Sequence, residues 1–145
     1  MGTKSSIEQL NSFLRGEMSA VETYQMALEK LDEISSARDE LLINLKSHQD
    51  RVAMLQDAIL ALGGTPAESS GPWGALAKIV EGTAKVLGEK TAIAALEEGE
   101  DHGLKDYTAD VDKLDPQHRD MVVHDLLPQQ RQTHDRVSAL KRRMS

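Results

Sequence analysis

Two stretches of the sequence have nearly the same pattern: G-E-M-S-A-V-E-T-Y at 16–24 and G-E-D-H-G-L-K-D-Y at 99–107. Each begins with a Gly-Glu pair and ends with a tyrosine seven residues after the glutamate. These two tyrosines, Tyr24 and Tyr107, are the only ones in the chain. Seven residues are close to two turns of an α-helix, so each glutamate lies on the same helix face as its tyrosine. The repeat predicts two copies of one helical unit.

A histidine follows each stretch, within a helical stripe of apolar residues: His48 in S-H-Q-D-R-V and His134 in T-H-D-R-V. Aligning the two D-R-V runs puts His48 opposite Thr133, one residue before His134. Positions three and four residues before an inward residue lie on the same side of a helix, so we expect both histidines to face inward. The chain then consists of two helix pairs, each contributing a carboxylate and an imidazole.

The composition limits the classes of function. A chain of 145 residues is long enough for one domain with a real core, and only 3% of its residues are aromatic. The net charge of -7 argues against a nucleic-acid partner, because phosphate binding needs clustered Lys and Arg. The absence of cysteine excludes disulfides, zinc fingers and thiol chemistry. No stretch approaches the ~18 apolar residues of a membrane span, so we expect a soluble, cytoplasmic protein with no membrane partner.

Apolar residues recur at helical spacing along most of the chain. The connection between the first two helices is short, which makes them antiparallel neighbours. We expect Pro128 to kink the last helix or to remove one backbone hydrogen bond. The prediction is a single all-α domain over 1–145, a four-helix bundle built from two repeated helix hairpins with a helical crossover. The predicted helices are 6–33, 36–63, 73–87 (the crossover), 89–114 and 116–143.

This pattern resembles the ferritin-like four-helix bundle. Residues 16–24 are similar to the first-helix motif of bacterioferritins and rubrerythrins. L-K-S-H-Q-D-R at 45–51 resembles their second-helix E-x-x-H-x-D-R, and G-G-T-P at 63–66 resembles the loop after it. The crossover helix and the defects in the motifs fit a divergent branch, the small rubrerythrin-related bacterial domains of unknown function. The resemblance implies a role related to stress or storage in a bacterium.

The resemblance also implies a metal site. A ferritin-like dimetal centre takes one Glu from each of two helices and Glu-x-x-His from each of the other two. Two carboxylates and two imidazoles of this chain match that ligand set, and they could hold one divalent ion, Zn, Fe or Mn. Carried over to this chain, the metal ligands are Glu17, His48, Glu100 and His134.

The two glutamates of the E-x-x-H motifs are missing, because Leu45 and Arg131 occupy their positions. Without these carboxylates a pair of irons has no bridging ligands and no charge balance, so we expect no ferroxidase activity. A dinuclear site could be restored if Glu97, one turn before Glu100, swung inward. Whether the protein is an enzyme stays open.

The alternative is a metal-free cluster. Arg131 could form an ion pair with Glu100 or Glu17, while Tyr24 and Tyr107 donate hydrogen bonds to the carboxylates. Such a cluster satisfies its own polar groups and needs no cofactor. The protein would then be a non-catalytic structural or partner-binding helical protein, and a homodimer is one form that it could take.

Overall fold

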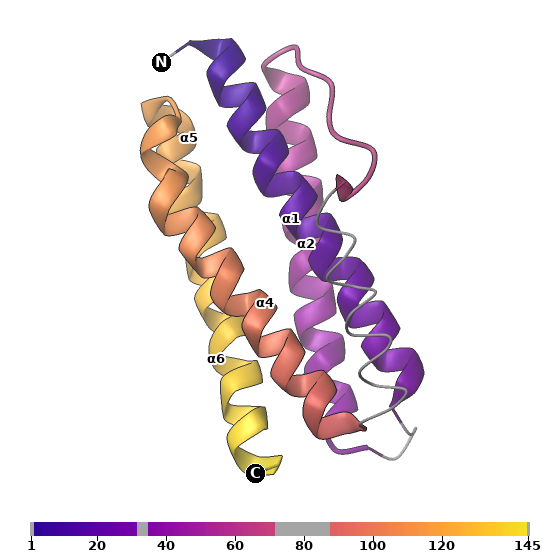
Figure 1. Ribbon diagram of the computed structural model, residues 1–145. Helices are drawn as coiled ribbons and strands as arrows, with labels where there is room; N and C mark the ends of the chain where they lie inside the picture. The colour runs from indigo at the N-terminus through magenta and orange to yellow at the C-terminus, as the bar shows by residue number, and fades with distance from the viewer. Residues whose placement is uncertain (1, 32–34, 72–87, 145) are drawn as a thin grey trace.

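The computed structural model describes residues 2–31, 35–71 and 88–144, and within these ranges it contains helices and no strand (Figure 1). The all-α prediction is therefore confirmed for the described residues. The predicted crossover helix at 73–87 lies outside them. No described helix is long and apolar enough to cross a membrane. The long helices are α1 (Thr3–Lys30), α2 (Arg38–Ala61), α4 (Glu89–Asp110) and α6 (Leu127–Met144).

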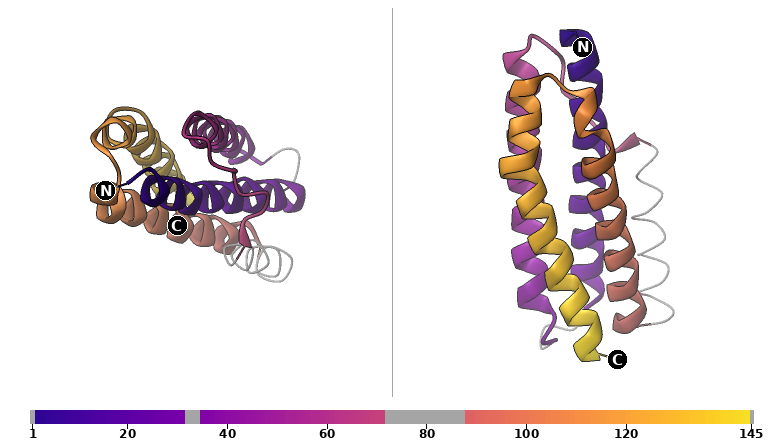
Figure 2. Two further views of the ribbon diagram at one scale, coloured as in Figure 1. Left: turned by 90° about the horizontal axis from the view of Figure 1, so that it is seen from above. Right: turned by 90° about the vertical axis from the view of Figure 1, so that its left-hand side faces the viewer.

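The long helices stand side by side as a bundle. The chain runs in one direction along α1 and α6 and in the opposite direction along α2 and α4 (Figures 1 and 2). The most extensive packing joins α1 to α2 and α4 to α6, and smaller contacts join α1 to α4 and α2 to α6. The described residues thus form two antiparallel helix pairs that pack against each other.

The apolar core is divided into two clusters along the bundle. One includes Leu41, Ile93 and Val137, and the other includes Leu10 and Ile59, all of them fully buried. Burial of these aliphatic side chains is the main favourable contribution to folding. Buried polar and charged residues, rather than more aliphatic ones, occupy the level between the two clusters. That polar level is where the two repeated motifs meet.

The last part of the chain is not one regular helix, which corrects the prediction of a single helix over 116–143. After α5 (Pro116–Met121) comes a π-helix, Val122–Leu126, in which the Leu127 N–H bonds to the Val122 carbonyl. Pro128 follows directly in α6. A π turn accommodates one extra residue, so the residues after it do not keep the register of a continuous α-helix. This register decides which side chains of α6 reach the bundle centre.

Candidate functional site

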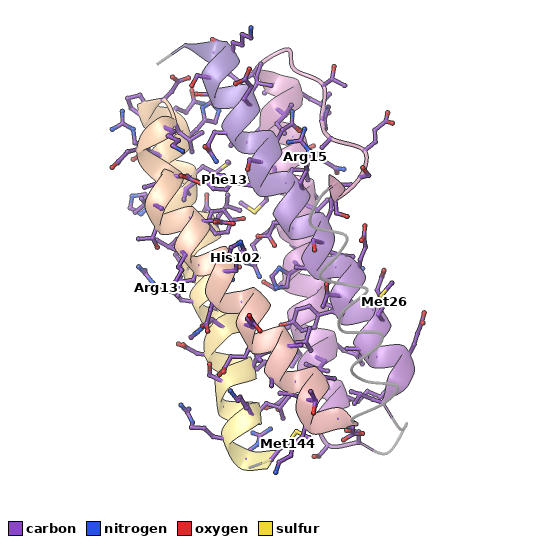
Figure 3. The ribbon with its side chains drawn as sticks, viewed as in Figure 1. Phe13, Arg15, Met26, His102, Arg131 and Met144 are labelled. Atoms are coloured by element: carbon purple, nitrogen blue, oxygen red, sulfur yellow. The ribbon has the colours of Figure 1, made fainter. Side chains whose placement is uncertain are left out.

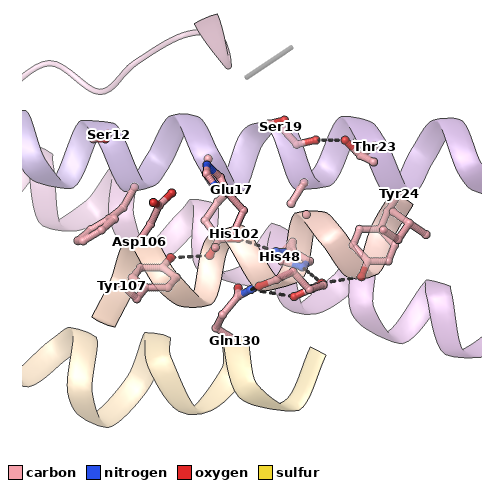
Figure 4. A pocket seen from close by; sticks show the side chains of 17 residues that line it. Ser12, Glu17, Ser19, Thr23, Tyr24, His48, His102, Asp106, Tyr107 and Gln130 are labelled. Atoms are coloured by element: carbon pink, nitrogen blue, oxygen red, sulfur yellow. Dashed lines mark hydrogen bonds and ion pairs between the residues drawn. The ribbon is translucent and has the colours of Figure 1, made fainter. Parts of the chain in front are cut away.

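At the centre, one imidazole stands between two carboxylates (Figure 4). The side chains of Glu17 on α1, His48 on α2 and Glu100 on α4 are at most 5% exposed. His48 Nδ1 lies 2.5 Å from Glu17 Oε1, and His48 Nε2 lies 2.7 Å from Glu100 Oε2. The two nitrogens are on opposite edges of the ring, so the ring holds the carboxylates apart. When protonated, His48 donates a hydrogen bond to each of them.

The two tyrosines connect the repeats reciprocally. The Tyr24 hydroxyl of the first repeat donates to Glu100 Oε2 of the second at 2.5 Å. The Tyr107 hydroxyl of the second repeat donates to Glu17 Oε2 of the first. Asn44 Nδ2 in turn donates to the Tyr24 oxygen at 3.0 Å. Each tyrosine therefore supplies a donor to the buried carboxylate of the other helix pair.

A fully buried arginine, Arg51, supplies a positive charge at the same level. Its Nη1 lies 3.3 Å from Glu17 Oε2 and donates to Gln130 Oε1. Its Nη2 donates to Thr133 Oγ1 at 3.0 Å. Arg51 was not among the residues predicted from the sequence. The signal that could have identified it is its spacing, because Arg51 follows His48 by three residues and so shares its helix face.

Two residues of α6 complete the cluster. Gln130 Nε2 donates to both the backbone carbonyl and Oε1 of Glu100, each at 2.9 Å. The Thr133 hydroxyl lies 2.8 Å from Glu100 Oε1. Gln130 can approach because Gly103 has no side chain, since a Cβ there would lie 2.8 Å from Gln130 Nε2. Neither Gln130 nor Thr133 was predicted as a site residue, although the D-R-V alignment placed Thr133 opposite His48.

The pKa values of the acidic and basic groups in the cluster are shifted by one another. Burial alone would raise the pKa of Glu17, but the positive charges of Arg51 and His48 and the hydrogen bonds from His48 and Tyr107 lower it to about 2. The pKa of Glu100 is lowered in the same way, against the effect of burial, chiefly by His48. Burial alone would lower the pKa of His48, but the two carboxylates raise it. Two carboxylates thus face one imidazole, whose pKa they raise, and one guanidinium.

His134 and Arg131 do not reach this cluster, which corrects the expectation that they face the centre. His134 Nε2 bonds to Asp101, and its Nδ1 lies 3.2 Å from Asp135 Oδ1. Arg131 is exposed and projects from the outer side of the bundle (Figure 3). The physical reason is the register of α6. This register turns Thr133 inward instead of His134, and Gln130 inward instead of Arg131. Of the four predicted metal ligands, the structure brings three together.

Glu97 also points elsewhere. Its Oε1 accepts a hydrogen bond from Lys141 Nζ at 2.9 Å, and this bond is the largest cause of its lowered pKa. Leu45, at the position of the first missing glutamate, packs against the apolar cluster that contains Leu41. The placement of these two side chains does not provide the extra carboxylate that a restored dinuclear site would need.

A small cavity of about 60 Å³ lies between α1 and α4, against the cluster (Figure 4). The residues that line it include Glu17, His48 and Glu100, together with Gly16 and Gly103. A Cβ added to Gly16 would meet nothing within 4 Å, so packing does not require this glycine. The volume has room for a few water molecules.

The donors of the cluster do not fit a dimetal centre. The two nitrogens of His48 point in opposite directions, and each is already hydrogen-bonded to a carboxylate. Glu17 and Glu100 also accept hydrogen bonds from the tyrosines, and the Arg51 guanidinium places a positive charge 3.3 Å from Glu17. Among the described residues, no group of three or more His, Asp or Glu side chains is arranged to hold a metal ion.

No curated protein and no solved structure matches this chain. A family model described as "Domain of unknown function (DUF2383)" matches residues 5–113. This range contains α2, α4 and all but the first two residues of α1, and with them Glu17, His48 and Glu100. The match covers most of the chain, and the protein therefore belongs to the DUF2383 family.

Proposed function

We propose that this protein is a ferritin-like bundle in which a metal-free, charge-neutral polar cluster occupies the place of a metal centre. Its role is then structural or partner-binding rather than catalytic. The observation that carries the proposal is the position of His48, whose two ring nitrogens each contact a different carboxylate, Glu17 or Glu100. A protonated ring that bridges two carboxylates in this way supplies them with two hydrogen-bond donors and with a positive charge, which takes the place of the charge of a metal ion.

The ferritin-like assignment is supported by the pairing of the helices and by the reciprocal contacts between the repeats. Two antiparallel pairs pack against each other, and each pair contributes one glutamate and one tyrosine to the centre. A two-fold relation between the pairs would produce this crossed arrangement.

A structural role is supported by the contacts of the cluster, which join all the long helices. Glu17 comes from α1, His48 and Arg51 from α2, Glu100 from α4, and Thr133 from α6. Fully satisfied buried networks favour one packing arrangement over its alternatives, since any shift leaves a polar group without a partner. We therefore propose that the cluster fixes the register between the two helix pairs.

A second candidate is a site for one Zn, Fe or Mn ion. Its support is that Glu17, His48 and Glu100, three side chains of the types that bind these metals, lie together next to the cavity. The ion would need a free ring nitrogen, so His48 would have to rotate and release one carboxylate. Binding would then compete directly with the hydrogen bonds of the cluster.

Metal analysis of protein purified without a His tag separates the two candidates. The metal-free proposal predicts far less than one Zn, Fe or Mn ion per chain, and a melting temperature that these ions do not raise. It also predicts Fe(II) oxidation in air no faster than in buffer. One ion per chain, lost in His48→Gln but retained in the matched variant His134→Gln, would establish the mononuclear site instead.

A further inference from the structure

We propose that Arg51 is the resident cation of the bundle centre and the residue that prevents divalent cations from binding there. The inference rests on the proposed function, because it explains how two buried carboxylates remain stable without a metal. Charged residues are rarely buried completely unless they are paired, yet Arg51 has no exposed surface. Its surroundings account for this burial.

The guanidinium is held from three helices. Nη1 contacts Glu17 on α1 and Gln130 on α6, and Nη2 donates to Thr133 on α6. Ser47, on the same helix as Arg51, accepts from Nη2 at 3.3 Å. A planar group with fixed donors is suited to such a site, and it stays charged at any pH at which the protein folds. The positive charge is therefore a permanent part of the site.

Gln130 holds the arginine in place through the two ends of its amide. The oxygen accepts from Arg51, and the nitrogen donates to Glu100. A glutamate could accept from Arg51 but could not donate to Glu100, and the two carboxylates would repel each other. Gln130 lies three residues before Thr133, just as Leu45 lies three before His48. In the register that α6 adopts, Gln130 rather than Arg131 therefore corresponds to Leu45, the position of the missing glutamate in the first repeat.

A divalent ion bound to Glu17 would lie within a few ångströms of the Arg51 guanidinium, which is itself fully buried. Like charges at this separation repel strongly in a medium of low dielectric constant. The cavity beside Glu17 leaves room for an ion, so the space alone does not exclude one. The charge of Arg51 opposes binding in addition to the hydrogen bonds of His48, and its removal should allow the centre to bind a cation.

The test compares Arg51→Met with Arg51→Lys and with Arg136→Met. Methionine removes the charge at similar length, and lysine keeps it. Arg136 matches Arg51 in the D-R-V alignment but donates to Asn44 Oδ1 at 2.9 Å. We expect Arg51→Met to bind Mn(II) or Zn(II) at one ion per chain, at least about tenfold more tightly than the other two variants. Its melting temperature should rise with either metal.

Equal and weak metal binding in all three variants would overturn the proposal. If Arg51→Met does not fold alone, its helical circular dichroism is measured with and without Zn(II) or Mn(II). Recovery of the helical signal with metal supports the proposal, and no recovery contradicts it. The metal content of the wild-type protein distinguishes failure of this inference from failure of the proposed function. A metal-free wild type with no gain in Arg51→Met refutes only the role of Arg51, whereas one ion per wild-type chain refutes the metal-free centre.

Discussion

The helix pair α1–α2 and the pair α4–α6 contribute the same acidic and tyrosine side chains to the centre, but they differ in the basic side chains that they contribute. Each pair supplies one glutamate, and each glutamate accepts from the tyrosine of the other pair. The positive charges of the cluster, however, both come from α2, where His48 and Arg51 lie. At the position that matches His48, α6 has Thr133 instead. The repeat thus provides two negative charges, and α2 alone provides the groups that neutralise them, because α6 has Thr133 opposite His48 and its Arg136 donates to Asn44.

The largest loss of stability should come from removing the imidazole of His48, which the pair α1–α2 has and the pair α4–α6 lacks at the centre. His48→Leu leaves two buried carboxylates without their shared donor, which typically costs about 3–5 kcal/mol of unfolding free energy. Thr133→Val removes a hydroxyl from the matching position and should cost about 1 kcal/mol. Urea unfolding of both variants measures the difference. Equal losses would mean that His48 has no special role in neutralising the carboxylates.

The dependence of stability on pH should show the same charge balance. The lowered pKa values of Glu17 and Glu100 stabilise the fold above their ordinary value of 4.5. This contribution is lost as the pH falls through the folded pKa of each carboxyl, which is about 2 for Glu17. For Glu17 alone it is roughly 3 kcal/mol. The raised pKa of His48 stabilises the fold below 6.5, and that contribution is lost as the pH rises through the folded pKa. Stability should therefore be greatest between about pH 4.5 and 6.5.

Urea unfolding from about pH 3 to pH 9 checks this profile. His48→Gln should lose most of the decrease in stability on the alkaline side. His134→Gln is the control, because Asp135 and Asp101 also raise the pKa of this histidine against the effect of partial burial. An alkaline decrease that disappears in His134→Gln and persists in His48→Gln would contradict the assignment.

Smaller changes in stability are expected for substitution of the two cavity-lining glycines, Gly16 on α1 and Gly103 on α4. Gly103→Ala places a Cβ 2.8 Å from Gln130 Nε2, so it should displace the amide and lower stability by about 1–2 kcal/mol. Gly16→Ala meets nothing within 4 Å and should raise stability by up to about 1 kcal/mol through helix propensity. Thermal unfolding measures both. Opposite signs are the predicted result, and stabilisation by both substitutions would show that Gln130 does not need the space at Gly103.

Much of this arrangement could be predicted from the sequence, because it depends on periodicity. Apolar spacing predicted the helices, and the Glu-Tyr repeat identified Glu17, Tyr24, Glu100 and Tyr107, all of which are buried at the centre. His48 lay within an apolar stripe and is also buried there. Each of these residues is on a regular stretch of helix, where a spacing of three, four or seven residues determines the face.

The rest depended on local geometry that periodicity does not describe. The π turn before Pro128 sets the register of α6, and the inward position falls on Thr133 rather than on His134. The D-R-V alignment contained a signal for this, but a shift of one residue leaves a side chain on the same side of a regular helix, so both histidines were expected to face inward. The metal-free alternative took Arg131 as the partner of a carboxylate because its position matched the motif. The residue that pairs with Glu17 is instead Arg51, which lies on the face of His48.

The protonation of His48 tests the central claim most directly. The account predicts that at about pH 6 both ring nitrogens carry protons, each donated to a carboxylate. A proton–nitrogen NMR spectrum of protein with ¹⁵N-labelled histidine, assigned with His48→Gln, should then show two N–H groups for this ring. Their signals should not change when one equivalent of Zn(II) is added. A ring with one protonated nitrogen, or signals that shift stoichiometrically with Zn(II), would contradict a metal-free, charge-neutral centre.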